Sequence, residues 1–214
     1  VALYAPLGAP DRGASPLREL GALKRPQVLL TLATGAIGFG GLFAVYTYVA
    51  STMITITGVS ERWVPLVLAI FGVGMTLGNL FAGWAADRNL NRTAILLMVW
   101  TAITLALFPL AAGNVWSLSV VIFLIGCGGG LGPVLQTRLM DVAGDAQVMA
   151  AAAHHSAFNF ANALGPWLGG LAIAAGYSFT ATGWIGAALS LAGLMVFLLA
   201  LAIERRSVPD LAMA

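Results

Sequence analysis

The sequence contains very little charge. Only ten of its 214 residues are Lys or Arg and eight are Asp or Glu, so charged side chains make up 8% of the chain. Soluble domains carry about 25% charged residues, and disordered chains are rich in charge and poor in apolar residues. Both classes are therefore excluded. A nucleic-acid-binding protein is not expected either, because no basic segment is long enough to hold phosphates.

Cysteine and catalytic groups are also scarce. Cys127 is the only cysteine, which excludes an internal disulfide, and its apolar neighbours indicate a small packing residue. His154 and His155 are adjacent but lack a carboxylate partner for a metal, so we expect them to form hydrogen bonds or to lie at an interface. No nucleophile–base pair, metal cluster or phosphate-binding loop is recognisable. We therefore expect a protein that is not an enzyme and that uses no cofactor or metal.

Apolar residues are what the sequence has in excess. Hydrophobic residues make up 60% of the chain, and a further 26 residues are glycine. A helix that crosses a bilayer needs about 20 mostly apolar residues. Barrel strands would alternate apolar and polar residues, which runs such as residues 192–203 do not. We expect an all-α membrane protein with six transmembrane helices, at residues 28–51, 63–86, 93–112, 115–137, 148–175 and 179–203.

The positive charges predict the orientation of these helices. Cytoplasmic loops of membrane proteins carry an excess of Lys and Arg. If the N-terminus is cytoplasmic, six helices leave Arg62 alone on the outer side. The other nine basic residues then lie on the inner side: Arg12, Arg18, Lys24, Arg25, Arg88, Arg92, Arg138, Arg205 and Arg206. A missed or surplus helix would destroy this asymmetry, so we expect both termini in the cytoplasm.

The chain divides into three expected parts. Residues 1–27 contain four prolines and several basic residues, which is typical of a cytoplasmic linker. Residues 28–203 form the six-helix bundle, and residues 204–214 form a cytoplasmic tail. Because the sequence opens on Val1 within such a linker, we expect it to be a fragment of a longer chain.

Glycine clusters occur in two of the predicted helices. The first helix contains Gly38-Phe-Gly-Gly41, and the fourth contains Gly126-Cys-Gly-Gly-Gly-Leu-Gly-Pro133. Such runs weaken a helix and are tolerated in a membrane where they line a cavity. Clusters in corresponding helices of two three-helix units are what an inverted repeat predicts, with a binding region near the middle of the membrane. We therefore expect two inverted three-helix repeats.

Two helices carry stripes of polar and small residues. The stripe on the second helix consists of Gly72, Thr76, Asn79, Gly83 and Asp87, and the stripe on the fifth consists of His155, Asn159, Asn162, Pro166 and Gly169. Residues three or four positions apart share one helical face. Because polar side chains that face lipid are costly, each stripe is either a hydrogen-bonding surface within this bundle or an interface with a second bundle.

No Asp, Glu, Lys or Arg lies in the middle of any predicted span. A proton-coupled carrier normally keeps an ionisable group within the membrane, so in a proton-coupled protein that group would lie outside these six helices. The first helix also carries Phe39, Phe43 and Tyr46, spaced four and three residues apart. This aromatic stripe either lines a cavity or packs against neighbouring helices.

The junction between the second and third helices reads Gly83-Trp-Ala-Ala-Asp87-Arg88-Asn-Leu-Asn-Arg92. It resembles the signature loop of the major facilitator superfamily, in which Gly, three residues, Asp and Arg are followed by Gly and basic residues. Leu90 and Asn91 depart from this pattern. The resemblance implies that Gly83, Asp87, Arg88 and Arg92 serve a cytoplasmic gate, with the aspartate capping a helix start.

The fifth helix reads Gly165-Pro-Trp-Leu-Gly-Gly170, which is similar to the end of the antiporter motif of the same family. Residues 135–144 and 156–166 resemble the sugar-efflux and chloramphenicol-exporter branch of the bacterial drug/proton antiporters. The resemblance implies half of a twelve-helix major facilitator fold in the bacterial inner membrane. Its implied partners are membrane lipid, a missing N-terminal six-helix half, a small-molecule substrate and protons.

The resemblance also implies site residues. The first and fourth helices would line the central cavity, and the second and fifth would contact the missing half. The substrate site would contain Phe39, Phe43, Tyr46, Gly129, Pro133 and Gln136. The interface would contain Thr76, Asn79, His155, Asn159, Asn162, Gly165, Pro166, Gly169 and Gly170. The implied function is export of a drug or sugar-like solute by proton antiport and alternating access.

Two other interpretations stay open. A self-sufficient six-helix protein would act as a homodimeric carrier or channel and would be active without a partner chain. A noncatalytic membrane subunit would only bind other proteins, and its function would tolerate a bulky residue in the glycine run, such as Gly130→Leu.

Overall fold

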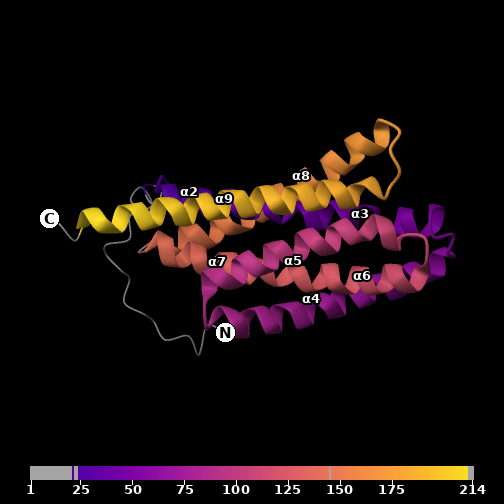
Figure 1. The fold of residues 1–214 in the computed structure, drawn as a ribbon, viewed down its shortest axis with the longest axis horizontal. Helices are drawn as coiled ribbons and strands as arrows, with labels where there is room; N and C mark the ends of the chain where they lie inside the picture. Colours follow the sequence, from indigo (N-terminus) through magenta and orange to yellow (C-terminus); the bar gives the residue numbers. More distant parts are fainter. Residues whose placement is uncertain (1–20, 22–23, 145, 212–214) are drawn as a thin grey trace, which may run out of the picture.

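The computed structural model describes residues 21, 24–144 and 146–211, and this part of the chain is helical apart from its connections. The prediction of an all-α protein is therefore confirmed for these residues. Figure 1 shows the helices lying along the long axis of one bundle. The expected linker at residues 1–27 falls almost entirely outside the described residues.

The helices make six passes along the bundle. The elements in chain order are α2 (Pro26–Gly38), α3 (Gly40–Thr55), the 3-10 turn η1 (Glu61–Trp63), α4 (Val64–Ala86), α5 (Leu90–Ala111), α6 (Val115–Cys127), the 3-10 turn η2 (Gly128–Gly130), α7 (Leu131–Ala143), α8 (Gln147–Ala174) and α9 (Ala181–Leu211). The pair α2 and α3 forms one pass, and α6, η2 and α7 form another.

Five of these passes are long and apolar enough to cross a membrane. The sixth pass, α8, has 28 residues, but His154, His155, Asn159 and Asn162 lower its hydrophobicity. The predicted spans fall on the six passes. Helix α9 continues past Ile203 to Leu211, into the expected tail.

Local sequence explains where several helices start and stop. Proline lies in the first turn of α2 and of α4, where no backbone N–H is needed. The side chains of Asn89 and Asn114 accept hydrogen bonds from the first turns of α5 and α6, as N-capping residues do. Gly144 ends α7 with a φ of 59°, in the left-handed region that glycine enters without strain.

Both predicted glycine clusters interrupt their helices. The first pass is divided at Phe39, between α2 and α3, where the backbone keeps helical angles of φ −77° and ψ −19°, and the fourth pass contains the 3-10 turn η2. The same glycines allow close crossings, because a Cβ on Gly41 would clash with the backbone of Gly186 on α9. Gly74 and Gly78 of α4 likewise face the backbone of α6. Small residues at such positions let membrane helices approach one another closely.

A large hydrophobic core runs through the described part of the bundle, and a smaller cluster lies around Val28 and Leu139. The broken helix formed by α2 and α3 packs against both α8 and α9, while α4 packs against α6. Leu42, Leu105, Phe108, Ile125 and Phe197 are fully buried in this core. Large apolar side chains also cover the outside, among them Leu80, Phe81, Leu110, Trp116 and Met195. An exposed apolar surface of this extent is what a bilayer-embedded protein presents.

The start of α2 and the end of α9 lie at the same end of the bundle (Figure 1). There the Gln27 Nε2 atom donates a hydrogen bond to the carbonyl oxygen of Ala200 at 2.8 Å. The loop between α4 and α5 lies at this end as well. An even number of passes brings the two ends of the bundle together in this way.

Candidate functional site

The predicted gate loop joins α4 to α5 in a short exposed turn. Arg88 is held by its own helix, because its guanidinium lies 3.6 Å from the centre of the Trp84 ring and donates to the Trp84 carbonyl oxygen at 2.7 Å. Asn89, rather than Asp87, caps α5, since its Oδ1 atom accepts from the backbone N–H of Arg92 at 2.9 Å. The capping role that the resemblance implied for the aspartate is therefore not filled at α5, and at other helix starts it stays a prediction.

Asp87 instead lines a groove of about 310 Å³ between α4, the start of α5 and α7. Gly83, Ala86 and Leu90 form one side of this groove, and Pro133, Val134, Thr137 and Asp141 form the other. The structure thus brings two predicted gate residues beside Pro133, which was predicted for the substrate site. Sequence reasoning missed Thr137 and Asp141 as groove residues, although both follow Pro133 at four-residue steps and so share its face.

The predicted aromatic stripe divides into a buried and an open part. Phe39 is only 6% exposed, and its ring packs 4.5 Å from Phe158 and 5.4 Å from Phe43, measured between ring centroids. Tyr46 is 42% exposed and lies 4.9 Å from Phe71. The Phe39 end of the stripe therefore packs between helices, whereas the Tyr46 end is exposed.

The remaining predicted substrate residues lie on the fourth pass. Gly129 is buried beneath the side chain of Met75, whereas Pro133 is exposed and Gln136 is half-buried. Sequence reasoning missed Phe158, which also faces Gly35 and Gly132 and therefore joins the first, fourth and fifth passes. Its four-residue spacing from His154, whose ring packs 4.3 Å away, is the signal that could have indicated it.

The polar stripe of α4 faces away from the bundle. Gly72, Thr76, Asn79, Gly83 and Asp87 are all exposed, while Gly74, Gly78 and Ala82 on the opposite face are buried. Space is open around Gly72 and Gly83, because an added Cβ would meet no atom within 4 Å. The Thr76 hydroxyl donates to its own helix, at the Gly72 carbonyl oxygen. Hydrogen bonding to other helices of this bundle therefore does not explain the stripe.

The stripe of α8 is polar and exposed at one end and packed at the other. His155, Asn159 and Asn162 are exposed. Gly165 and Gly169 are buried against α3, where a Cβ would meet Gly40 or Tyr48. The Tyr48 hydroxyl donates to the Pro166 carbonyl oxygen at 3.1 Å and lies close to Gly170. Only the polar end of the stripe is thus free to contact another bundle.

The amides of both stripes lack partners within this bundle. Among the residues that the structure describes, the side chains of Asn79, Asn159 and Asn162 form no hydrogen bond. Helix α7 packs against both α4 and α8 and so lies between the two stripes. Its residues Pro133 and Thr137 are exposed. An amide that faces hydrocarbon without a partner costs free energy. The amides of the two stripes are therefore expected to contact polar groups outside this bundle.

The comparisons with known proteins agree on one protein family. Residues 30–212 match the family described as "Major Facilitator Superfamily". The protein named "Inner membrane transport protein YdhP" of Escherichia coli K12 is 34% identical over 202 residues, which cover 92% of this chain and 52% of that protein. The chain spans about half the length of the curated relatives it matches.

Two further relatives carry more specific names. The "Chloramphenicol resistance protein" of Streptomyces lividans is 32% identical over 72% of this chain and 40% of its own length. The "Probable sugar efflux transporter" of Pasteurella multocida is 30% identical over 89% of this chain and 47% of its own length.

Proposed function

The chain belongs to the major facilitator superfamily, and from this membership we propose that it is the C-terminal six-helix half of a twelve-helix secondary transporter. The polar stripes carry this proposal. Exposed amides on α4 and α8 without partners are expected where a second bundle covers these helices. Thr76, Asn79, His155, Asn159 and Asn162 are the residues placed at that interface, with Pro166 at its edge.

The proposed transport is export of a small organic solute, drug-like or sugar-like, in exchange for protons. The names of the relatives from Streptomyces lividans and Pasteurella multocida support efflux. The solute would lie against Tyr46, Phe43, Pro133 and Gln136, which are at least partly exposed on the first and fourth passes. The buried Phe39 and Gly129 would shape this site from behind.

The proposed repeat is supported by the two helix breaks. Phe39 separates α2 from α3 in the first pass, and η2 separates α6 from α7 in the fourth. In the proposed arrangement of two inverted three-helix units, these two passes would correspond. Broken helices near the middle of a membrane are typical of transporters whose halves rock around a central site. The gate would be the groove beside Asp87, because it lies at the loop that joins α4 to α5.

Proton coupling would depend on a group outside this bundle. No charged side chain lies in the middle of the six predicted spans, whereas proton relays use ionisable groups within the membrane. The missing half would therefore supply the acid. Both termini of this chain would lie in the cytoplasm, since nine of its ten basic residues then lie on the inner side.

Transport by the twelve-helix protein tests the proposal. The chain, joined to an N-terminal six-helix half, is reconstituted in vesicles, and the export of chloramphenicol or a sugar is measured with and without a proton gradient. We expect gradient-dependent export that Asn162→Leu slows. Gln147→Leu is the matched control, because it changes another exposed polar residue of α8 outside the stripe. Export at the same rate with and without the proton gradient would contradict proton antiport.

The same preparation separates the alternatives. Transport by this chain alone, without a second half, would favour a homodimeric carrier or channel. A noncatalytic subunit would be favoured by two results together. Neither the chain alone nor the joined protein would transport a solute, and Gly130→Leu would leave binding of other proteins unchanged. We expect Gly130→Leu to abolish export, because its Cβ would clash with Gly78 and Ala82 of α4.

A further inference from the structure

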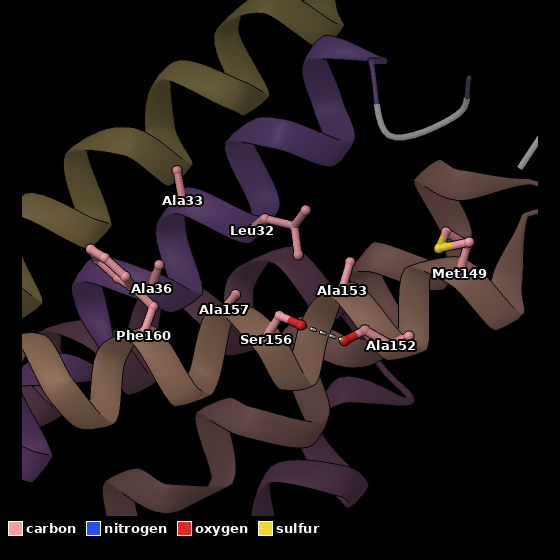
Figure 2. A pocket seen from close by; sticks show the side chains of 9 residues that line it. All are labelled: Leu32, Ala33, Ala36, Met149, Ala152, Ala153, Ser156, Ala157 and Phe160. Carbon is pink, nitrogen blue, oxygen red and sulfur yellow. Dashed lines mark hydrogen bonds between the residues drawn. The ribbon is translucent and has the colours of Figure 1, made fainter. Parts of the chain in front are cut away.

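A second groove, of about 520 Å³, opens between α2 and α8 (Figure 2). The wall formed by α2 contains Leu32, Ala33 and Ala36, and the wall formed by α8 contains Met149, Ala152, Ala153, Ser156, Ala157 and Phe160. The Ser156 hydroxyl is turned to its own helix, where it donates to the Ala152 carbonyl oxygen at 3.2 Å. The lining is therefore apolar in character, and its alanine side chains are small enough to leave the groove open.

The groove uses a face of α8 that neither the core nor the polar stripe occupies. At 3.6 residues per turn, its residues are centred about 120° from the stripe of His155, Asn159 and Asn162. They are about as far from the buried face that contains His154 and Ala161. Because the proposed function assigns the polar stripe to the second bundle, the groove faces the surrounding lipid.

The length of the groove matches one leaflet. Met149 and Phe160 are eleven residues apart, or about 16 Å along the helix at 1.5 Å per residue. Half of a hydrocarbon core that is about 30 Å thick measures about 15 Å. A helix from a partner would need a groove through the whole membrane, whereas a single acyl chain from one leaflet fills this one.

The groove has a basic end. Arg25 precedes α2 and donates from Nη1 to the carbonyl oxygen of Ala143, the last residue of α7, at 3.0 Å. This contact places its guanidinium at the end of α7, four residues before α8 begins at Gln147, and so toward the Met149 end of the groove. Lys24 is exposed next to it. Figure 2 shows the start of α2 at the same end as Met149. Basic groups between helices at a membrane surface attract anionic lipid headgroups.

We propose that this groove holds one acyl chain of an anionic phospholipid, whose phosphate is bound by Lys24 and Arg25. The guanidinium keeps N–H donors beyond the one bonded to Ala143, so it offers a charge-assisted hydrogen bond to a phosphate oxygen. The lipid comes from the leaflet at the α2 end of the bundle. That leaflet is cytoplasmic under the orientation of the proposed function, on which this detail and the exposure of the groove to lipid both rest.

Photolabelling in nanodiscs tests the proposal. The purified chain is placed in a mixture of phosphatidylglycerol and phosphatidylcholine, with a trace of phosphatidylglycerol that carries a diazirine in the middle of its acyl chain. Mass spectrometry of peptides then locates the label. We expect it to concentrate on residues 152–160 of α8 and to fall when unlabelled phosphatidylglycerol is added. An even spread over exposed apolar residues such as Leu80 and Ala202 would overturn the proposal.

Variants separate the acyl groove from the headgroup site. Ala153→Leu fills the groove and should remove the label from α8, whereas Ala202→Leu, at an exposed alanine of α9, should not. Lys24→Gln should lower labelling by phosphatidylglycerol about fivefold relative to phosphatidylcholine, the effect of one basic residue near a lipid surface. Arg206→Gln is its matched control, since Arg206 is equally exposed.

Two outcomes of these variants would count against the site. Equal labelling by the two lipids in the unmodified chain overturns the headgroup assignment, and a label that survives Ala153→Leu overturns the groove. Failure of solute export would leave the labelling unchanged, so this inference and the proposed function fail separately.

Discussion

Arg138 on α7 donates a hydrogen bond from Nη2 to the Oε2 atom of Glu204 on α9 at 2.6 Å. Arg138 is only 7% exposed, whereas the Glu204 side chain is 39% exposed. The Arg138 Nε atom is buried without a partner in the described part of the chain. This ion pair ties the fourth pass to the last one at the end of the bundle that carries most of the basic residues.

Removing Glu204 should destabilise the bundle more than removing the pair. Glu204→Gln leaves the buried guanidinium without its carboxylate, and we expect the free energy of unfolding to fall by about 2 kcal/mol. Breaking a fully buried pair costs roughly 3–5 kcal/mol. The expected loss is smaller here because Glu204 is partly solvated. The double variant Arg138→Met, Glu204→Met should lose less stability, because it leaves no buried charge without a partner. Unfolding in detergent, followed by circular dichroism, measures both. Equal stability of Glu204→Gln and the unmodified chain would show that the pair is incidental.

Two glycines of α4 should respond oppositely to the same substitution. A Cβ on Gly78 would clash with the backbone of Cys127, so Gly78→Ala should force α4 and α6 apart and lower the unfolding temperature. Gly72 faces open space, and Gly72→Ala should stabilise the helix by up to about 1 kcal/mol. Thermal unfolding of the two variants side by side measures the contrast. A similar loss in both would contradict the close crossing of α4 and α6.

Asn89 and Asp87 should affect different properties. Asn89→Ala removes the N-cap of α5 and should cost about 1 kcal/mol of stability. Asp87→Asn should leave stability nearly unchanged, because Asp87 is exposed, and should slow solute export through the proposed gate. Denaturant unfolding and vesicle transport are compared for both variants. An Asp87→Asn variant that exports normally would remove the gate assignment.

Cysteine labelling should place the two ends of α5 in different compartments. Cys127 is first replaced by alanine, since it is the only native thiol. In intact cells, a membrane-impermeant maleimide should then label Gly113→Cys but reach Arg92→Cys only after permeabilisation. Tyr177→Cys, in the exposed connection between α8 and α9, should behave like Gly113→Cys. Labelling of the Arg92 and Gly113 positions from one side would contradict the proposed topology.

Much of the fold could be read from the order of the residues. Long apolar runs predicted the positions of the passes, because burial in hydrocarbon depends on the composition of each segment alone. The glycine clusters around Phe39 and at Gly128–Gly130 predicted weakened stretches of helix, since glycine weakens a helix wherever it occurs. Family motifs in the chain indicated the major facilitator superfamily before the comparisons did. Each of these features is local in sequence.

The candidate site was less predictable, because it depends on which helix faces which. Periodicity placed Asn79 and Asp87 on one face of α4 but left open whether that face pointed into the bundle, and only the packing of Gly74 and Gly78 against α6 turned it outward. Phe158 packs against Phe39, and Thr137 and Asp141 line one groove with Asp87, although the helices concerned are far apart in the sequence. Helical spacing shows which residues share a face, but not which helix that face meets. Local sequence determined the helices, where they break and the likeness to a transporter family. Tertiary structure alone decided which polar faces lack partners and where the two grooves open, because these depend on long-range packing between helices.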